Sequence, residues 1–399
     1  MRLEDLVAAT ALLGVASGAV IEKKEAATSL KTDQLAAQAM GNLAQFVQVN
    51  GYFSDGCTLE NISFRREWGA LSAEERKEYI AAVQCISTKP SRTPKELCPG
   101  CVTRYDDFVA THINQTLTIH GTPGTKLSKK GNFLSWHRYF TWSYEQALRN
   151  ECGYTGTQPY WNWPQYAEDP LSSPIFDGSD TSMSGNGVYR NHTPVYVPSS
   201  ALPYVEIPPA QGGGCVYTGP FRNFTTRLGP VSPAYEGLPT NPSADGLGSN
   251  PRCLRRDINP WVSSRFTNDL NTSSLIETYS DVSDFQTIMQ GDFPSGYLGV
   301  HTGGHLTING DPGGDLFASP GDPVFFLHHA MIDRVWWTWQ NQDVAARTYA
   351  VGGTHTLNNS PPSANTTLDD ILDLAYTADP ITIRDAMSTL AGPFCYVYV

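Results

Sequence analysis

The chain has 399 residues, of which 40% are hydrophobic and 17% are charged. This composition is typical of a globular protein rather than a disordered one, and the length allows one large domain or two. With 27 basic and 39 acidic residues the net charge is −12. That balance disfavours nucleic acid as a partner, because binding it needs a basic face.

The N-terminus carries an apolar run over residues 6–16, followed by small residues at 17–19. This run resembles the apolar core and cleavage site of a signal peptide, although Glu4 and Asp5 stand where a positive region is usual. A helical cap or a pro-segment is the alternative. No other stretch approaches the roughly 18 apolar residues of a membrane span, so we expect no membrane partner. We expect residues 1–19 to be a signal peptide and residues 20–399 to form one catalytic domain.

The cysteines and glycosylation sequons also favour the secretory pathway. An even number of cysteines allows up to four disulfides; the eight are Cys57, Cys85, Cys98, Cys101, Cys152, Cys215, Cys253 and Cys395. Asn-X-Ser/Thr triplets begin at Asn61, Asn114, Asn191, Asn223, Asn271, Asn358 and Asn365. The Cys98–Cys101 pair could be a redox site or half a zinc site, but no second such pair exists and a structural disulfide is favoured. We therefore expect a secreted glycoprotein.

Apolar periodicity predicts helices at residues 33–49, 72–86, 105–119, 133–149, 273–290, 297–306 and 323–340. Ser72 and Glu75 form a capping box that opens the second, and Asp322 and Pro323 are the expected N-cap and first turn of the last. Residues 159–260 are rich in Pro, Gly, Ser and Asn, which predicts long loops with a few short strands. The absence of repeats and linkers favours a mainly α fold, a helix bundle decorated by loops.

The histidines are the informative residues. Three of the nine lie early in the chain, at His112, His120 and His137. Four lie late, at His301, His305, His328 and His329. The other two, His192 and His355, stand apart from both groups. His301 and His305 share one face of a helical turn, and either His328 or His329 could add a third imidazole from the next helix. Two clusters of three suit two metal ions, each bound between facing helices of a bundle.

Copper fits these clusters better than other metals. Imidazole suits copper, zinc, iron and nickel, but three neutral donors favour an ion that cycles between the +1 and +2 states. Zinc hydrolases with paired histidines often place a Glu between them as general base. Here that interval holds Thr302, Gly303 and Gly304, so the hydrolase machinery is missing.

Two long motifs now point to a family. Phe133-Leu-Ser-Trp-His-Arg138, followed by Glu145, resembles the copper A signature of tyrosinases, catechol oxidases and molluscan haemocyanins. Residues 322–336, Asp-Pro-Val-Phe-Phe-Leu-His-His and onward, resemble their copper B signature, and Tyr396-Val-Tyr398 resembles the tyrosine motif that closes their catalytic core. The chain is most similar to the short, secreted polyphenol oxidases of filamentous fungi, which implies a four-helix-bundle dicopper core.

The resemblance also implies roles for single residues. Copper A would be held by His112, His120 and His137, and copper B by His301, His305 and His329, with O₂ as co-substrate. His328 would then be a packing residue. Asp333 could orient an imidazole by accepting its second N–H, or pair with Arg334 or another arginine. Phe325 matches a phenylalanine under the substrate site; otherwise it is a core aromatic.

Small phenols are the implied substrates, with catechols oxidised to o-quinones while O₂ is reduced to water. Strong tyrosinases often carry Asn after the first copper B histidine, where this chain has Thr302, and Asp292 is a candidate for the carboxylate that acts with it. Leu306 stands where some tyrosinases carry a cation. Thr118 stands where many members carry a cysteine bonded to a copper A histidine, so we expect no thioether. We expect diphenolase activity on uncharged catechols, with weak monophenolase activity.

Other functions stay open at this point. A true tyrosinase and an o-aminophenol oxidase would share every ligand. A haemocyanin-like O₂ carrier would bind O₂ but keep phenols out; the signal-like N-terminus and the end of the chain at the tyrosine motif, without a shielding domain, argue against it. A structural protein without metal is disfavoured by the intact histidine clusters.

Overall fold

A computed structural model describes residues 29–51, 56–120, 131–356 and 359–399. Its helices are α2 (Lys31–Asn50), α3 (Ala73–Ile86), α4 (Arg104–Ile119), α5 (Phe133–Cys152), α6 (Pro260–Phe266), α7 (Asp269–Thr278), α8 (Val282–Gln290), α9 (Gly299–Ile308), α10 (Val324–Gln340) and α11 (Val344–Arg347). None of these described helices is long and apolar enough to span a membrane. The expected signal peptide lies outside the described residues. The mainly α prediction is confirmed.

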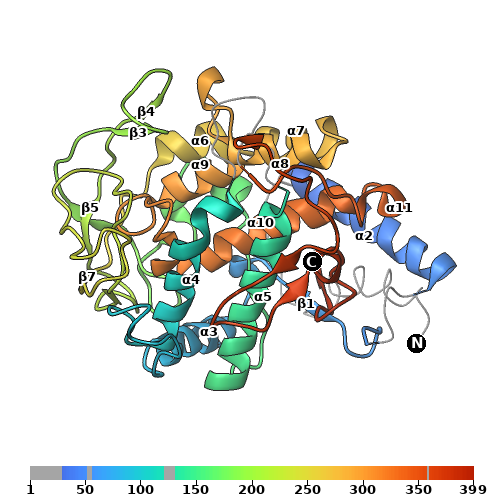
Figure 1. Ribbon diagram of the computed structural model, residues 1–399, viewed down its shortest axis with the longest axis horizontal. Helices are drawn as coiled ribbons and strands as arrows, with labels where there is room; N and C mark the ends of the chain where they lie inside the picture. Colours follow the sequence, from blue (N-terminus) through green and yellow to red (C-terminus); the bar gives the residue numbers. More distant parts are fainter. Residues whose placement is uncertain (1–28, 52–55, 121–130, 357–358) are drawn as a thin grey trace, which may run out of the picture.

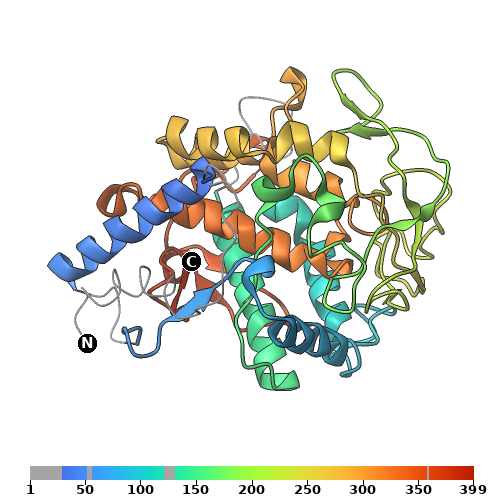
Figure 2. The same cartoon turned by 180° about the vertical axis from the view of Figure 1, so that it is seen from behind.

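Helix α10 is the centre of the fold. Every one of its residues is buried, because apolar and aromatic side chains cover all of its faces. Figures 1 and 2 show α10 crossing the middle of the molecule, and α2, α5, α7 and α9 pack against it. Helix α4 packs in turn against α5. The helices α4, α5, α9 and α10 are the ones that carry the clustered histidines.

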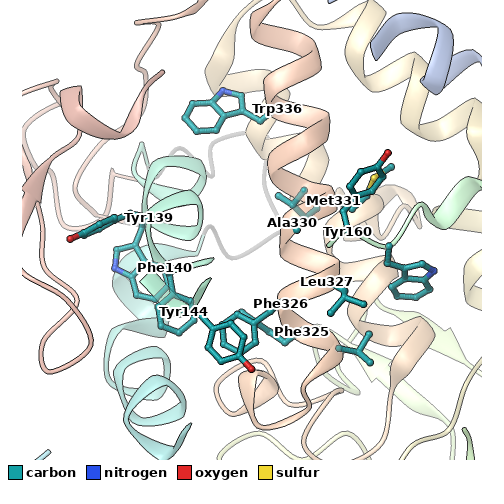
Figure 3. Packing of buried hydrophobic residues seen from close by; sticks show 14 of the residues in the cluster. Tyr139, Phe140, Tyr144, Tyr160, Phe325, Phe326, Leu327, Ala330, Met331 and Trp336 are labelled. Atoms are coloured by element: carbon teal, nitrogen blue, oxygen red, sulfur yellow. The ribbon is translucent and has the colours of Figure 1, made fainter. Parts of the chain in front are cut away.

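Aromatic side chains fill the seam between α5 and α10. Figure 3 shows Phe140 and Tyr144 of α5 on the side of the helix toward Phe326 of α10, whereas Tyr139 points away from α10. The rings of Tyr144 and Phe326 stack with their centroids 3.5 Å apart and their planes 4° apart. Rigid rings bury a large area with little loss of side-chain entropy, so this contact fixes the distance between the two helices.

The strands form short two-stranded ribbons rather than a larger sheet. Those described are β1 (Ser63–Arg65) with β10 (Tyr396–Tyr398), β2 (Gly187–Tyr189) with β5 (Gly213–Val216), β3 (Val195–Val197) with β4 (Val205–Ile207), β6 (Thr225–Thr226) with β7 (Arg252–Cys253), and β8 (Ile371–Leu372) with β9 (Ile381–Thr382). Six of these ten strands lie in the segment where loops with a few short strands were predicted. The pair β1–β10 is parallel and brings the two ends of the domain together.

All eight cysteines form disulfides: Cys57–Cys395, Cys85–Cys152, Cys98–Cys101 and Cys215–Cys253. The structural role predicted for Cys98 and Cys101 is supported, because the two are bonded to each other and both side chains are fully buried. The bridge between Cys57 and Cys395 lies beside the parallel ribbon, and it holds the first and last strands together.

The predicted helices are found with their ends shifted by a few residues, and the number of helices is larger than predicted. The single helical region expected at 273–290 is two helices, because the Asp281 side chain accepts the N–H groups of Ser283 and Asp284 and starts α8 afresh. Helix α6 lies where a loop was expected to end; the Asn259 side chain accepts the N–H of Trp261 and caps it. The capping box before α3 is confirmed.

A buried carboxylate joins three of these elements to α10. The Asp333 carboxylate accepts hydrogen bonds from Arg138 Nε on α5 (2.6 Å) and Arg65 on β1 (3.4 Å). The hydroxyls of Tyr396 and Tyr398, both on β10, donate to the same oxygen at 2.6 Å each. Residues two apart on a strand face the same side, which explains the Tyr-Val-Tyr spacing. The expectation that Asp333 orients an imidazole is wrong; the alternative, an ion pair with another arginine, is the one observed.

We predict that Asp333→Asn costs about 3–5 kcal/mol of unfolding free energy, because it leaves two buried guanidinium groups without their counter-charge. Burial alone would raise the pKa of Asp333, but Arg138 and Arg65 hold it below its ordinary value, so the carboxylate is charged in the folded protein. Urea denaturation measures the loss. Asp369→Asn is the matched control, because its ion pair with Arg384 is exposed; a change below about 0.5 kcal/mol is expected there. Equal costs for the two variants would contradict the prediction.

Candidate metal centre

The first histidine cluster lies between α4 and α5. His112 is on α4, His120 follows its last residue and His137 is one turn into α5. Each Nδ1 lies at hydrogen-bonding distance from a backbone carbonyl: 2.7 Å from Phe317, 3.1 Å from Thr116 and 2.8 Å from Phe133, respectively. An imidazole that donates from Nδ1 keeps its Nε2 lone pair free. The Nε2 atoms of His112 and His137 are buried and have no hydrogen-bond partner, as expected of metal ligands.

The second cluster lies between α9 and α10. The Nε2 atom of His305 is 3.2 Å from Nε2 of His301 and 3.2 Å from Nε2 of His329. Nitrogen ligands about 2 Å from one tetrahedral ion stand about 3.3 Å apart, so these three atoms suit a single metal ion. His305 is only half-buried, whereas His301 and His329 are buried.

The two clusters face each other across the bundle. The rings of His137 and His329 stack with centroids 4.5 Å apart and planes 15° apart. His120 and His301 stack less closely, with centroids 5.7 Å apart. The sequence prediction of two trios is therefore supported, and the structure brings all six imidazoles into one buried site with its nitrogen atoms turned inward.

Burial keeps these imidazoles neutral. It lowers the pKa of five of them well below the ordinary value, and the neighbouring imidazoles lower it further; the five are His112, His137, His301, His305 and His329. Neutral imidazole is the form that binds a metal ion. No other group of three or more His, Cys, Asp or Glu side chains in the described residues could hold a metal ion.

His328 lies beside the second cluster without joining its short contacts. Both of its ring nitrogens are buried without hydrogen-bond partners, and burial lowers its pKa to about 3. The ring packs on His305, with centroids 4.5 Å apart, and on Trp163, with centroids 5.2 Å apart. One ring nitrogen of His328 lies within 4.8 Å of a ring nitrogen of each of the other three histidines. The 3.2 Å contacts, however, join only His301, His305 and His329. We therefore still assign His328 the packing role that the resemblance implied.

The two glycines between His301 and His305 have a steric cause that the sequence did not reveal. A Cβ on Gly304 would stand 2.2 Å from Cε1 of His328, and one on Gly303 would stand 2.8 Å from Cβ of Phe266. Glycine costs about 1 kcal/mol within a helix. Glycine is required at both positions because α6 and α10 occupy the space beside the α9 backbone that a larger side chain would need.

A cavity of about 230 Å³ opens on this site. It is lined by the end of α4 with His120, by residues 195–198 and 232–234, by α9 with His301 and His305, and by residues 313–316. Thr302 and Leu306 line it, as the sequence predicted. Phe325 does not; it lies behind the imidazoles, stacked on His329 with centroids 4.1 Å apart, so the core-aromatic alternative is the observed one.

The carboxylate in the cavity is not the expected one. Asp292 is absent from the lining, and its backbone pairs with Tyr297 instead, so its prediction is wrong. Asp315 lines the cavity. Each of its oxygens accepts two backbone N–H groups, from Phe317 and Ala318 on one side and from Val231 and Ser232 on the other. Sequence proximity to the histidines favoured Asp292, whereas the fold of a distant loop selects Asp315.

The remaining predicted positions are as follows. Thr118 is exposed, and its hydroxyl donates to the Gln115 carbonyl; since all eight cysteines are in disulfides, none is available for a thioether. His355 is half-exposed and pairs with Asp370. His192 is buried in contact with Asp257, which the sequence did not predict. Both histidines lie outside the metal site.

Comparisons with known proteins agree with this geometry. Residues 102–342 match the family described as the common central domain of tyrosinase. Tyrosinase P of Aspergillus terreus is 40% identical over 340 residues, covering 84% of this chain and 91% of that protein. The N-acetyl-6-hydroxytryptophan oxidase ivoB of Emericella nidulans is 38% identical over 359 residues, covering 86% and 93%. A solved polyphenol oxidase from Thermothelomyces thermophila is 42% identical, with a TM-score of 0.84 over 92% of this chain and 98% of that one.

We predict that Gly304→Ala lowers the metal content of the second cluster, because the added methyl group displaces the His328 ring onto His305. After incubation with copper, elemental analysis should find close to one ion per chain instead of two. Gly41→Ala is the matched control, because nothing lies within 4 Å of its added Cβ; it should keep full occupancy and gain up to about 1 kcal/mol of stability. Full occupancy in Gly304→Ala would rule out the steric account.

Proposed function

The chain belongs to the tyrosinase family, and from that premise we propose that it is a secreted polyphenol oxidase that oxidises o-diphenols to o-quinones with O₂. We assign copper A to His112, His120 and His137, and copper B to His301, His305 and His329. The observation that carries the proposal is that six imidazoles, five of them buried and one half-buried, gather at one site beside a cavity whose lining is mainly apolar. The family implies two copper ions, and the donor set fits them, since imidazole suits copper.

A copper pair held by these six histidines would supply the redox chemistry, namely the binding of O₂ and the acceptance of two electrons from each diphenol. The protein supplies ligands and a binding site. Carbonyl oxygens hold the Nδ1 protons of the first cluster, so these rings cannot turn away from the metal. The half-buried His305 faces the cavity together with His120 and His301, which directs the hydroxyl groups of a bound ring to the metal site.

The cavity favours diphenols over monophenols. A monophenol must lose a proton before it can be hydroxylated, and that step needs a base. Asp315 is the one acidic side chain that lines the cavity in the described part of the chain, and four backbone N–H groups already occupy its oxygens. Thr302 is no base either, because its hydroxyl donates to the Gln290 carbonyl at 2.7 Å. These contacts support weak monophenolase activity.

One comparison favours a second candidate. The oxidase from Emericella nidulans is named for N-acetyl-6-hydroxytryptophan, a hydroxylated indole rather than a simple phenol. An oxidase of this kind, or an o-aminophenol oxidase, would use the same ligands and the same cavity. The O₂ carrier is less well supported, because the cavity reaches His120, His301 and His305, whereas a carrier must exclude phenols.

We also propose that residues 1–19 are removed on secretion and that residues 20–399 form one glycosylated domain. The four disulfides support an oxidising compartment. The sequon residues Asn61, Asn114, Asn191, Asn223 and Asn365 are exposed, as glycan attachment requires.

Substrate class is predicted as follows. With copper-loaded protein in an oxygen electrode, catechol should be oxidised without a lag, at an initial rate at least about tenfold above that of phenol, since one base-dependent step is avoided. o-Aminophenol and a 6-hydroxyindole test the second candidate. Phenol turnover equal to or faster than catechol turnover would reject the diphenolase assignment, and full copper content without O₂ uptake would indicate a carrier.

Substitution of single histidines should distinguish the proposed copper B ligands from the histidines that bind no metal. His329→Ala should reduce the copper content to about one ion and lower O₂ uptake by more than about 100-fold, since loss of an outer-shell partner alone costs 10–100-fold. His355→Ala, a half-exposed histidine outside the site, should keep two ions and its full rate. Two ions in His329→Ala would show that another residue, such as His328, is the ligand.

A further inference from the structure

The wall of the cavity opposite the metal site is a hairpin that the proposed chemistry does not use. Strands β3 and β4 pair antiparallel, with Val195 opposite Ile207 and Val197 opposite Val205. Figure 1 shows the hairpin beside α6 and α9. Residues 195–198, including Tyr196, line the cavity, so the outer part of a bound substrate must lie against this hairpin.

The hairpin packs on the metal-binding helix through a small core of its own. This second apolar cluster is separate from the main core and consists of Val195, Val205, Ile207, Val262, Phe266, Phe293, Leu298 and Leu306. Three of its members, Val195, Phe293 and Leu306, also line the cavity. Leu306 directly follows His305, so the same side chain joins the hairpin, the cavity and a proposed copper ligand.

A buried histidine–aspartate contact holds the base of the hairpin. His192, in the segment that leads into β3, has Nε2 3.1 Å from the Asp257 carboxylate, and both side chains are buried. The same carboxylate accepts the N–H groups of Ala210 (2.9 Å) and Gly212 (2.8 Å), in the segment that follows β4. Asp257 therefore ties both legs of the hairpin to one point, and its own N–H donates to the carbonyl of Ile308 at the end of α9.

His192 is engaged on every side. Its Nδ1 is 2.8 Å from the Thr193 carbonyl oxygen, so both ring nitrogens lie at hydrogen-bonding distance from an oxygen atom. Tyr235 stacks on the ring with centroids 4.4 Å apart, and its hydroxyl donates to the Gly213 carbonyl. Residues 232–234, just before Tyr235, form another part of the cavity lining. One histidine–aspartate contact thus positions two walls of the cavity.

The outer part of the cavity has the chemistry of an apolar subsite. Leu117 and Leu316 line it and are largely exposed, at 67% and 45%, whereas His120 and His301 are buried at its inner end. No lysine or arginine of the described residues lines it, and the oxygens of Asp315 are already occupied. A carboxylate substituent, such as that of an amino acid, would lose hydration here without gaining a cationic partner.

We propose that the β3–β4 hairpin is the specificity element of this site, that the His192–Asp257 pair is its positioning device, and that it selects aromatic substrates with an uncharged, apolar substituent. This inference rests on the proposed function in one respect, the orientation of the bound substrate. If the hydroxyl groups of the substrate ring point to the metal site, its substituent points to Tyr196. His192 and Asp257 are positioning residues, because they touch the hairpin and not the substrate.

Binding without turnover tests this proposal. Under nitrogen, calorimetry on the copper-loaded protein compares resorcinol with 4-butylresorcinol. The butyl group should tighten binding at least about tenfold, because each buried methylene contributes about 0.8 kcal/mol. Tyr196→Ala and His192→Phe should reduce this preference to about threefold or less while resorcinol binding and the copper content stay unchanged. A wild-type preference near one overturns the proposal.

The controls separate positioning from general damage. His355→Phe makes the same substitution in the other His–Asp pair, which is half-exposed and outside the cavity; it should keep the full preference for the butyl group. An unaltered preference in Tyr196→Ala overturns the proposal even if His192→Phe fails to fold. Since no oxidation is measured, a protein that prefers 4-butylresorcinol but does not oxidise catechol would disprove the proposed function and leave the hairpin assignment standing.

Discussion

The ion pair between Arg138 and Asp333 is the contact on which the geometry of the metal site depends. Arg138 directly follows His137 on α5, and Asp333 lies one turn after His329 on α10, so their 2.6 Å contact lies next to the stacked rings of His137 and His329. Removing a carboxylate from water costs several kcal/mol unless charged partners surround it. Asp333 has such partners, two guanidinium groups and two tyrosine hydroxyls. The relative position of α5 and α10, which carry His137 and His329, is therefore fixed electrostatically as well as by packing.

The two histidine clusters are held in different ways. In the first, backbone carbonyls receive the Nδ1 protons of all three rings, which sets tautomer and orientation together. In the second, the Nδ1 atoms of His301 and His329 are buried without partners, so packing alone orients these rings. Phe325 stacks on His329, and His328 fills the space that Gly304 leaves open. The second cluster also carries the half-buried His305, so the less constrained half of the site supplies two of the three histidines that line the cavity, His301 and His305, and the first cluster supplies His120.

The sequence predicted what local spacing determines. His301 and His305 are one helical turn apart, and the motifs around His137 and His329 are contiguous in the sequence. The sequence therefore predicted the helices and the candidate ligands on them together. It could not predict contacts made across the fold. Asp333 meets Tyr396 and Tyr398 only because β10 pairs with β1, and that pairing joins opposite ends of the domain. The same reason explains the wrong choice of Asp292: whether a carboxylate lines the cavity depends on residues 231–232, which approach Asp315 from a separate loop. His192 looked like a loop histidine because its partner is 65 residues away.

The loops between α5 and α9 are part of the catalytic structure rather than decoration. Helix α9 has ten residues, two consecutive glycines and no side-chain cap at its N-terminus, so its intrinsic stability is low. Its neighbours must hold it. Residues 255–259 do so from the loop region: Asp257 and Asn259 donate their N–H groups to the last carbonyls of α9, while Arg256 pairs with Asp322 at the start of α10 at 2.7 Å. Because the same segment also ties down the β3–β4 hairpin, the histidines of α9 and the hairpin wall of the cavity share one support. A change in that loop would therefore alter the fit of the substrate and the placement of His301 and His305 together, whereas a change in the hairpin itself would alter the fit alone.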